Sequence, residues 1–326
     1  MLILTGDIGG TNARVAIAEI TQHTTSLYNE ANFATADFSG PLDIVAHSIA
    51  TAGIQPELIS LGIAGPVRNQ VGTATNLSWS FNARELEQHL NLPNVYILND
   101  LEAIAWGISR LVPEDYLELH AGQPDPEGNI SVIAIGTGLG KAGICRHTDQ
   151  FHPFATEGGH ADFAPATELE WELFKYLQQN YPHVSWERIV SGTGIPHILE
   201  FLVQYREGVL SQALQSGLAQ GGGASLIAAA AKTCPLCAET MELFVSMFGR
   251  EVGNHALNIM ATGGIYLAGG IAPKILSQLQ NPNFLATIAA KGRLHAIVHN
   301  MPVRVILNDQ VALRGAALAG MAALAM

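Results

Sequence analysis

The sequence is poor in charged residues, and those that it has are mostly acidic. Asp, Glu, Lys and Arg make up 13% of the 326 residues, and 28 acidic against 16 basic residues give a formal net charge of −12. Nucleic-acid phosphates attract basic surfaces, so this balance argues against nucleic acid as a partner. A bound anionic nucleotide would have to be held by backbone amides and Mg²⁺ rather than by a basic field.

Cysteine is also scarce. The chain has 3 cysteines, Cys145, Cys234 and Cys237, which are too few for a disulfide framework in a chain of this length. Cys234 and Cys237 have the spacing of a zinc or redox pair. A structural zinc site needs about four ligands, however, and no second cysteine pair exists. The sequence therefore predicts buried or surface thiols.

A long apolar segment that could cross a membrane is missing too. Residues 312–326 are almost wholly apolar, but they are fewer than the roughly 20 residues that span a bilayer and include Arg314. They predict a buried C-terminal helix packed closely on a sheet. The start at Met1 lacks the basic region of a signal peptide. We therefore expect a soluble, cytoplasmic protein without a membrane partner.

Apolar residues, in contrast, are abundant. They make up 48% of the chain, which is ample for large cores, and the length favours two domains. Strand-like runs alternate with helical stretches, which is typical of an α/β protein with a mostly parallel sheet. We expect strands at 2–4, 15–20, 58–64, 95–98, 131–135, 265–268 and 303–307, helices at 41–51, 82–90, 101–109 and 312–326, and a mainly helical stretch from 167 to 261.

A strand, a glycine-rich turn and a second strand occur twice along the chain. This repetition suggests an internal duplication, and two similar halves facing each other would place both turns in the cleft between them. We place a small α/β domain at residues 1–110, completed by 301–326, and a large α/β domain at 111–300.

The first of these turns, residues 6–11, combines glycines with a carboxylate. The glycines remove Cβ atoms where the chain must bend tightly, so that backbone N–H groups can point at an anion. The Asp7 carboxylate would repel a phosphate unless a cation lay between them, so Mg²⁺ is implied. A strand follows the turn, whereas a helix follows a P-loop or a Rossmann turn. The alternative is a plain tight hairpin that contains Asp7.

The second turn, residues 136–140, also follows a strand. Gly138, Gly140 and Gly143 have the spacing of a dinucleotide-binding loop, but no helix opens there, and the residues do not fit a Walker A motif. Lys141 follows this turn, where it could contact a phosphate or be solvated. The sequence favours a solvated lysine.

Polar candidates for a binding site follow other strands. Asp100 stands where a strand runs into a helix, so its carboxylate could accept a proton from a substrate hydroxyl or could cap the helix. Asn99 offers a donor and an acceptor. Glu157 and His160 are separated by glycines that break a helix, so they predict a loop that binds a polar ligand rather than a helical metal pair. With Glu187, these groups match the hydroxyls of a sugar.

Short motifs, taken in chain order, make the sequence resemble the bacterial glucokinases. These belong to the superfamily that joins sugar kinases, actin and heat-shock ATPases. The resemblance implies two duplicated ribonuclease H-like α/β domains with an interdomain cleft. The motifs cover nearly the whole chain and lie at 6–14, 75–76 with Trp79, 99–100, 136–140, 157–165, 187–192 and 268–273.

The resemblance implies ATP-dependent transfer of the γ-phosphoryl group to the 6-hydroxyl of glucose, giving glucose 6-phosphate and ADP, the first step of glycolysis. Asp100 would be the catalytic base, and Asp7 would hold Mg²⁺ through water. The residues implied to bind the sugar are Asn99, Asp100, Glu157, His160 and Glu187. The residues implied to bind ATP are Gly6, Asp7, Ile8, Gly9, Gly10, Thr11, Gly136, Thr137, Gly138, Gly269 and Gly270. We also expect a homodimer.

Other functions on the same fold stay open at this point. A kinase for another hexose or for an N-acetylhexosamine would share these motifs. A nucleotide-switched binding protein would not need Glu157, His160 and Glu187 together, and a sugar sensor would bind glucose without any effect of ATP. The related repressor–kinase family carries a cysteine-rich zinc motif that does not follow His160 here, which points away from a repressor role.

Overall fold

The computed structural model describes residues 1–21, 24–74, 77–147 and 150–325, and the chain divides into two compact units. The first unit comprises Met1–Tyr116, Ala142–Ala155 and Asn308–Met326, and the second comprises Leu117–Lys141 and Thr156–Leu307. The domain bounds given above stay a prediction. The motif at Thr75 and Asn76 lies outside the described residues.

The first unit is built on a mixed sheet whose described strands lie in the order β3-β2-β1-β4-β8. The strands are β1 (Leu2–Ile8), β2 (Asn12–Ile20), β3 (Thr25–Ala34), β4 (Leu58–Ile63) and β8 (Val95–Asn99). β1 pairs antiparallel with β2 and parallel with β4, and β4 pairs parallel with β8. The carboxyl ends of β1, β4 and β8 therefore meet at one edge of the sheet. A small antiparallel sheet contains β5 (Val67–Arg68), β6 (Val71–Thr73) and β7 (Ser80–Asn82).

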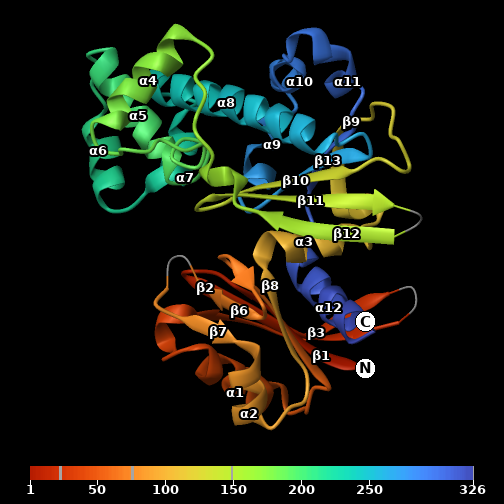
Figure 1. Ribbon diagram of the computed structural model, residues 1–326. Helices are drawn as coiled ribbons and strands as arrows, with labels where there is room; N and C mark the ends of the chain where they lie inside the picture. The colour runs from red at the N-terminus through yellow and green to blue at the C-terminus, as the bar shows by residue number, and fades with distance from the viewer. Residues whose placement is uncertain (22–23, 75–76, 148–149, 326) are drawn as a thin grey trace. The chain divides into compact units, whose positions relative to one another are not determined.

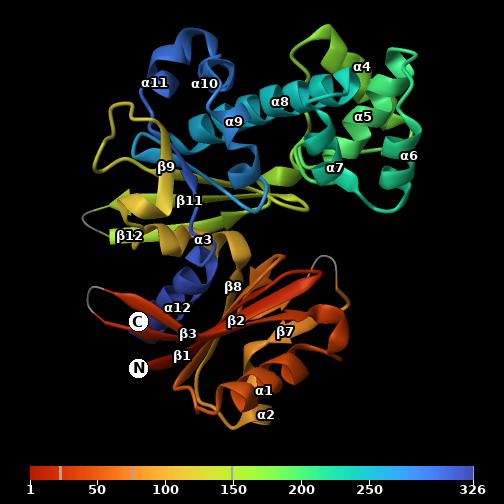
Figure 2. The ribbon, with the colours of Figure 1, turned by 180° about the vertical axis from the view of Figure 1, so that it is seen from behind.

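Helices cover both faces of this five-stranded sheet. They are α1 (Pro41–Ala52), α2 (Ala83–Leu90), α3 (Asp100–Ile108) and α12 (Val311–Leu324). Because side chains alternate along a strand, Leu4 and Ile8 of β1 pack with Ile44 of α1, whereas Ile3 packs with Ala317 of α12. Figure 1 and Figure 2 show α1 and α2 on one side of the sheet and α12 on the other.

The C-terminal helix packs closely on its neighbours, as predicted. A Cβ atom on Gly315 of α12 would lie 1.7 Å from the carbonyl oxygen of Ala103, and one on Gly107 of α3 would lie 2.3 Å from that of Val311. Only glycine allows the two helix backbones to come this close. No helix in the described residues is long and apolar enough to cross a membrane.

A second sheet has its described strands in the order β12-β11-β10-β13-β14-β9, with β10, β13 and β14 parallel. The strands are β9 (Tyr116–His120), β10 (Ile130–Ile135), β11 (Leu139–His147), β12 (Gln150–Thr156), β13 (Gly264–Ala268) and β14 (Val303–Ile306). Each sheet, numbered by its own strands from β1 and from β10, begins with the order 3-2-1-4-5. The predicted duplication of an α/β unit is therefore confirmed.

Helices make up most of the second unit between residues 167 and 261, as predicted. They are α4 (Glu168–Gln178), α5 (Gly194–Tyr205), α6 (Gln212–Ala219), α7 (Gly223–Ala230) and α8 (Pro235–Ile259), followed by α9 (Leu276–Leu279), α10 (Pro282–Ala289) and α11 (His295–His299). The apolar side chains of β10, β13 and α8 form one continuous core. Figure 1 shows α8 as the long helix of this unit.

The edge strand β3 was missed by the sequence analysis. Among the described strands, only β2 pairs with β3, and most side chains of β3 are exposed or half-buried. A strand of this kind does not need the apolar run by which buried strands are recognised.

Candidate functional site

The first glycine-rich turn connects β1 to β2 and is fixed by backbone bonds. The Gly9 N–H donates to the carbonyl oxygen of Asn12 at 2.9 Å. The Gly10 carbonyl accepts from the Thr35 hydroxyl at 3.0 Å, and the Thr11 carbonyl accepts from the Thr35 N–H at 3.0 Å. Thr35, the residue that follows β3, thus bonds to two carbonyl groups of the turn. These bonds fix the conformation of the turn.

Gly6 and Asp7 lie in strand β1, so the prediction that they form part of the bend was wrong. Gly6 is paired with Val15 of β2 and Leu61 of β4, and a Cβ atom on Gly6 would lie 2.8 Å from Cδ2 of Leu61. The glycine is needed for close packing of the strands rather than for a turn. Ile8 is also in β1 and fully buried, so only its backbone could contact a ligand.

Asp7 is half-buried near the carboxyl end of β1, opposite Arg14 of β2. Burial raises the pKa of the Asp7 carboxyl from 3.8 to about 6, against the lowering effect of Arg14. The Arg14 guanidinium is itself bound to Glu30 and Asp309. Mg²⁺ keeps several waters and is held by one or two carboxylates plus substrate phosphates, so a single partly buried carboxylate fits that ion.

The predicted residues of the first unit come together at the carboxyl edge of its sheet. Gly62 at the end of β4 pairs with Asp7 in the parallel register. A Cβ atom on Gly62 would lie 3.6 Å from the Asp100 Cα atom and 3.6 Å from the Gly6 carbonyl oxygen. Ligands of open α/β sheets bind at such an edge.

Asn99, rather than Asp100, caps helix α3. The Asn99 Oδ1 atom accepts from the N–H groups of Leu101 at 2.9 Å and Glu102 at 3.2 Å, and its Nδ2 donates to the Gly65 carbonyl at 3.1 Å. Asp100 is the first helical residue, and its Oδ1 lies 2.9 Å from the Leu101 nitrogen. The interpretation of Asp100 as the cap was wrong, and Asn99 fixes the position from which Asp100 projects.

The second glycine-rich turn adjoins the turn after β13. The Gly136 N–H bonds to the Gly138 carbonyl at 3.0 Å, and the Gly136 carbonyl accepts from Gly192 at 2.8 Å. Gly269 has φ +85°, and a Cβ atom there would lie 2.3 Å from the Ile135 carbonyl oxygen. A side chain at Gly269 would therefore separate these two turns, which carry Gly136, Thr137, Gly138, Gly269 and Gly270.

Three predicted sugar-binding side chains lie together in the second unit. His160 Nε2 is 3.9 Å from Glu157 Oε2, and His160 Nδ1 is 3.8 Å from Glu187 Oε1. Glu157 precedes a short 3₁₀ turn, Gly158–His160, of which His160 is the last residue, and both side chains are exposed, whereas Glu187 is partly buried. The predicted loop, in place of a helix, is confirmed. The arrangement presents two carboxylates and a ring nitrogen on one surface.

Glu187 also connects this cluster to the second glycine-rich turn. Its Oε2 atom accepts from the Leu139 N–H at 2.9 Å. A Cβ atom on Gly138 would lie 2.4 Å from the same oxygen. The absence of a side chain at Gly138 therefore allows the Glu187 carboxylate to reach the turn.

Lys141 departs from its prediction. It is only 3% exposed and forms an ion pair with Glu251 of α8, so the prediction of a solvated lysine was wrong. The sequence analysis did not consider Glu251. Other charged residues, such as Glu239 and Glu242, lie in the same helix, so no signal in the sequence marked Glu251 as the partner of Lys141.

The two closely spaced cysteines form no metal site. Cys234 and Cys237 are free thiols at the start of α8, and burial raises the pKa of Cys237 to about 12. The described residues contain no group of three side chains that could hold a metal ion.

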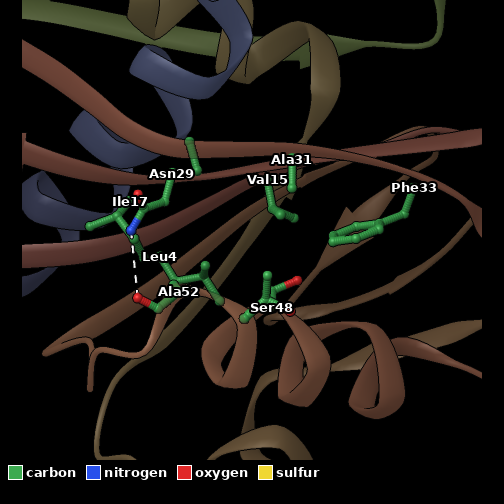
Figure 3. A pocket seen from close by; sticks show the side chains of 10 residues that line it. Leu4, Val15, Ile17, Asn29, Ala31, Phe33, Ser48 and Ala52 are labelled. Atoms are coloured by element: carbon green, nitrogen blue, oxygen red, sulfur yellow. Dashed lines mark hydrogen bonds between the residues drawn. The ribbon is translucent and has the colours of Figure 1, made fainter.

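A small hollow lies away from these residues in the first unit, between β1–β3 and α1 (Figure 3). Its lining includes Leu4, Phe33 and Ser48, and Asn29 Nδ2 donates across it to the Ala52 carbonyl at 3.5 Å. Its volume of about 10 Å³ leaves room for about one water molecule. The hollow is therefore too small for a sugar or a nucleotide.

Comparison with known proteins gives a consistent result. The family model Glucokinase matches residues 4–323. A glucokinase of Nostoc sp. is 39% identical, over 97% of this chain and 98% of its own. The crystal structure of a glucokinase from an Antarctic psychrotroph has 30% identity and a TM-score of 0.84, covering 98% of this chain and 99% of its own.

A more distant structure shares the fold. It is a ROK family glucokinase from Streptomyces griseus in complex with glucose and AMPPNP, with 21% identity and a TM-score of 0.65 over 97% of this chain and 98% of its own. Because the family model spans nearly the whole chain and the Nostoc relative matches end to end, this protein belongs to the glucokinase family.

Proposed function

We propose that this protein is an ATP-dependent glucokinase that transfers the γ-phosphoryl group of ATP to the 6-hydroxyl of glucose, giving glucose 6-phosphate and ADP. Membership of the glucokinase family supports this activity. The complex of the Streptomyces relative with glucose and an ATP analogue supports the pair of substrates.

One relationship within the second unit carries the proposal. Glu187 faces His160 with one carboxylate oxygen and accepts the Leu139 N–H with the other. Leu139 belongs to the second glycine-rich turn and directly follows residues 136–138, whose backbone would bind phosphate. A sugar bound at Glu187 would therefore lie next to a phosphate bound at this turn, and transfer requires that the two reacting groups be close together.

In the proposed mechanism the protein positions its substrates. Asn99, Asp100, Glu157, His160 and Glu187 bind the sugar hydroxyls, and the two glycine-rich turns bind the phosphates through backbone N–H groups. The transition state of phosphoryl transfer is loose, so positioning and charge neutralisation provide most of the catalysis. The Asp100 carboxylate orients the 6-hydroxyl and accepts its proton as the bond to phosphorus forms.

Mg²⁺ completes the proposed site. Asp7 would hold the ion through water, and the ion would neutralise charge on the phosphates. Burial raises the pKa of Asp7, and a cation beside the carboxyl would favour its ionised form.

The experiment that tests the proposal is ADP release with MgATP, measured with and without glucose. Glucose-dependent ADP release is expected, with glucose 6-phosphate as the second product. A panel containing fructose, mannose and N-acetylglucosamine tests which sugar is the substrate. If one of these were turned over faster than glucose, that sugar would be assigned as the substrate instead. ATP hydrolysis that does not depend on any sugar would contradict the proposal.

The homodimer and the cytoplasmic location are part of the same proposal. Light scattering of the purified protein tests the first, and cell fractionation tests the second.

A further inference from the structure

Two consecutive residues of α8, Arg250 and Glu251, form buried ion pairs in the second unit. Glu251 pairs with Lys141 of β11, and their side chains are 1% and 4% exposed. Arg250 pairs with Glu170 of α4, whose side chain is 1% exposed. A buried ion pair is weak evidence for stability because desolvation offsets the attraction, so these pairs need another explanation.

We name residues 156–166, which carry Glu157 and His160, the sugar loop. Each ion pair contains a residue that contacts one end of this loop. At its start, the Thr156 hydroxyl donates to the Lys141 carbonyl at 3.2 Å and accepts from the Gly158 N–H at 3.1 Å. A Cβ atom on Gly158 would lie 3.1 Å from Cδ of Lys141, so the lysine side chain runs directly beneath the loop.

The end of the sugar loop is held from the same helix. The Ala166 N–H donates to Glu170 Oε2 at 2.7 Å, while Glu170 Oε1 faces Arg250. Glu170 connects Arg250 to the end of the loop through its side chain. At the start of the loop, the Lys141 backbone carbonyl accepts the Thr156 hydroxyl, and the Lys141 side chain, which Glu251 holds, lies beside Gly158.

Glu251 is in turn fixed from its other side. Its Oε2 atom accepts from Asn254 Nδ2 at 2.9 Å, and Asn254 Oδ1 accepts from Lys291 Nζ at 2.7 Å. Burial raises the pKa of Glu251, while Lys141, Asn254 and Lys291 each lower it. The carboxylate therefore has little freedom to follow a displaced lysine.

We propose that Lys141 and Glu251 are positioning residues for sugar binding, which anchor the start of the sugar loop to α8 and so set the positions of Glu157 and His160. The inference rests on the proposed function, and it concerns the sugar side of the reaction rather than the ATP side. The Lys141 ammonium group is buried and paired with Glu251, so we assign it a positioning role and not a contact with substrate.

The first measurement compares the glucose and ATP KM values of wild type, Lys141→Met and Glu251→Gln. A displaced loop changes the position of two sugar-binding groups, so we expect the glucose KM to rise at least about fivefold with the ATP KM within about twofold. Arg206→Met is the control, because Arg206 pairs with Glu239 at the opposite end of α8 at 2.7 Å. It should leave both KM values unchanged.

The double variant Lys141→Met/Glu251→Met separates an effect on the loop from a loss of folding. It removes both charges of the buried pair, and Asn254 and Lys291 keep their bond to each other. We expect the double variant to regain most of the Tm that the single variants lose but to keep the raised glucose KM, because no charged pair with α8 then fixes the side chain that lies beside Gly158. Recovery of both would overturn the proposal. So would a lower kcat with both KM values unchanged in the single variants, since that result reports only a smaller folded fraction.

Hydrogen exchange gives a readout that does not depend on activity. In the double variant, amides of residues 156–166 should exchange faster than in wild type, and in Arg206→Met they should not. Unchanged exchange in the double variant would overturn the anchoring role even if the enzyme phosphorylates glucose. Absence of glucose-dependent ADP release in wild type, with exchange as expected, would instead contradict the proposed function alone.

Discussion

The Glu187 carboxylate accepts a hydrogen bond from the Leu139 N–H at 2.9 Å. This bond orients Glu187 so that its other oxygen faces His160. It also connects a sugar-binding candidate to the second glycine-rich turn, to which Leu139 belongs. Variants of this side chain should therefore affect both substrates, whereas variants of its neighbours should affect one.

Replacing Glu157 by alanine should weaken glucose binding alone. The change removes an acceptor for a sugar hydroxyl, at about 1–3 kcal/mol for each unmade bond. Glu187→Ala should weaken glucose by a similar amount and also raise the ATP KM, because Leu139 loses its acceptor. Steady-state kinetics with each substrate varied in turn measures both effects. A larger effect of Glu157→Ala on ATP than on glucose would place this residue at the nucleotide instead.

Asp100→Asn should retain the fold and glucose binding but lose turnover. The amide oxygen can still accept the Leu101 N–H but cannot accept the proton of the 6-hydroxyl, and general-base contributions are about 10²- to 10⁴-fold in rate. Asp43→Asn is a suitable control, since Asp43 also lies in the first turn of a helix and bonds only to Ser39 in the contacts described. Near-normal kcat in Asp100→Asn would show that the residue is not the base.

Asn99→Ala should reduce both stability and activity. It removes a cap that accepts two N–H groups, which costs about 0.5–2 kcal/mol of unfolding free energy. Turnover should also fall, because Asp100 is the next residue. Asn281→Ala removes the corresponding cap of α10 and should lower stability by a similar amount with unchanged kcat. Urea unfolding and single-turnover kinetics compare the two variants, and equal kinetic effects would mean that Asn99 does not position Asp100.

Asp7→Asn should stabilise the protein in the absence of ligands at neutral pH. The carboxyl has a pKa of 3.8 as its ordinary value and about 6 in the folded protein, so folding takes up a proton between these values. Stability contributed by the neutral carboxyl is therefore present below pH 3.8 and is lost as the pH rises towards 6. The difference between 3.8 and about 6 corresponds to about 3 kcal/mol in favour of the variant above pH 6.

Urea unfolding from pH 4.5 to 7.5 without Mg²⁺ measures the difference in unfolding free energy between Asp7→Asn and wild type. This difference should increase up to about pH 6 and then stay constant. The same variant should use MgATP poorly while binding glucose normally, which a titration of rate against Mg²⁺ tests. A variant that is less stable than wild type throughout this pH range would show that Asp7 only shapes the strand.

The sequence predicted the elements whose residues are buried on both sides. β4 and β10 are fully buried strands, and their apolar runs appear in the sequence with nearly the bounds of the structure. Some turns and helix ends could also be predicted, because glycines and a capping asparagine such as Asn82 act on their immediate neighbours in the sequence. The residues at the carboxyl ends of β1 and β8 could thus be chosen from local patterns and from the resemblance of the ordered motifs to a family.

Contacts between distant residues were decided by the tertiary structure. Nothing in the sequence around Lys141 states that Glu251 lies beside it, so the lysine was expected to be solvated. Likewise, Gly6 was assigned to a bend because its need for space arises from Leu61 on another strand. Local sequence sets backbone preferences within a few residues, whereas burial and ion pairing depend on which segments the fold brings together. For this physical reason, only the structure could show that Lys141 and Glu251 pair beneath the sugar loop.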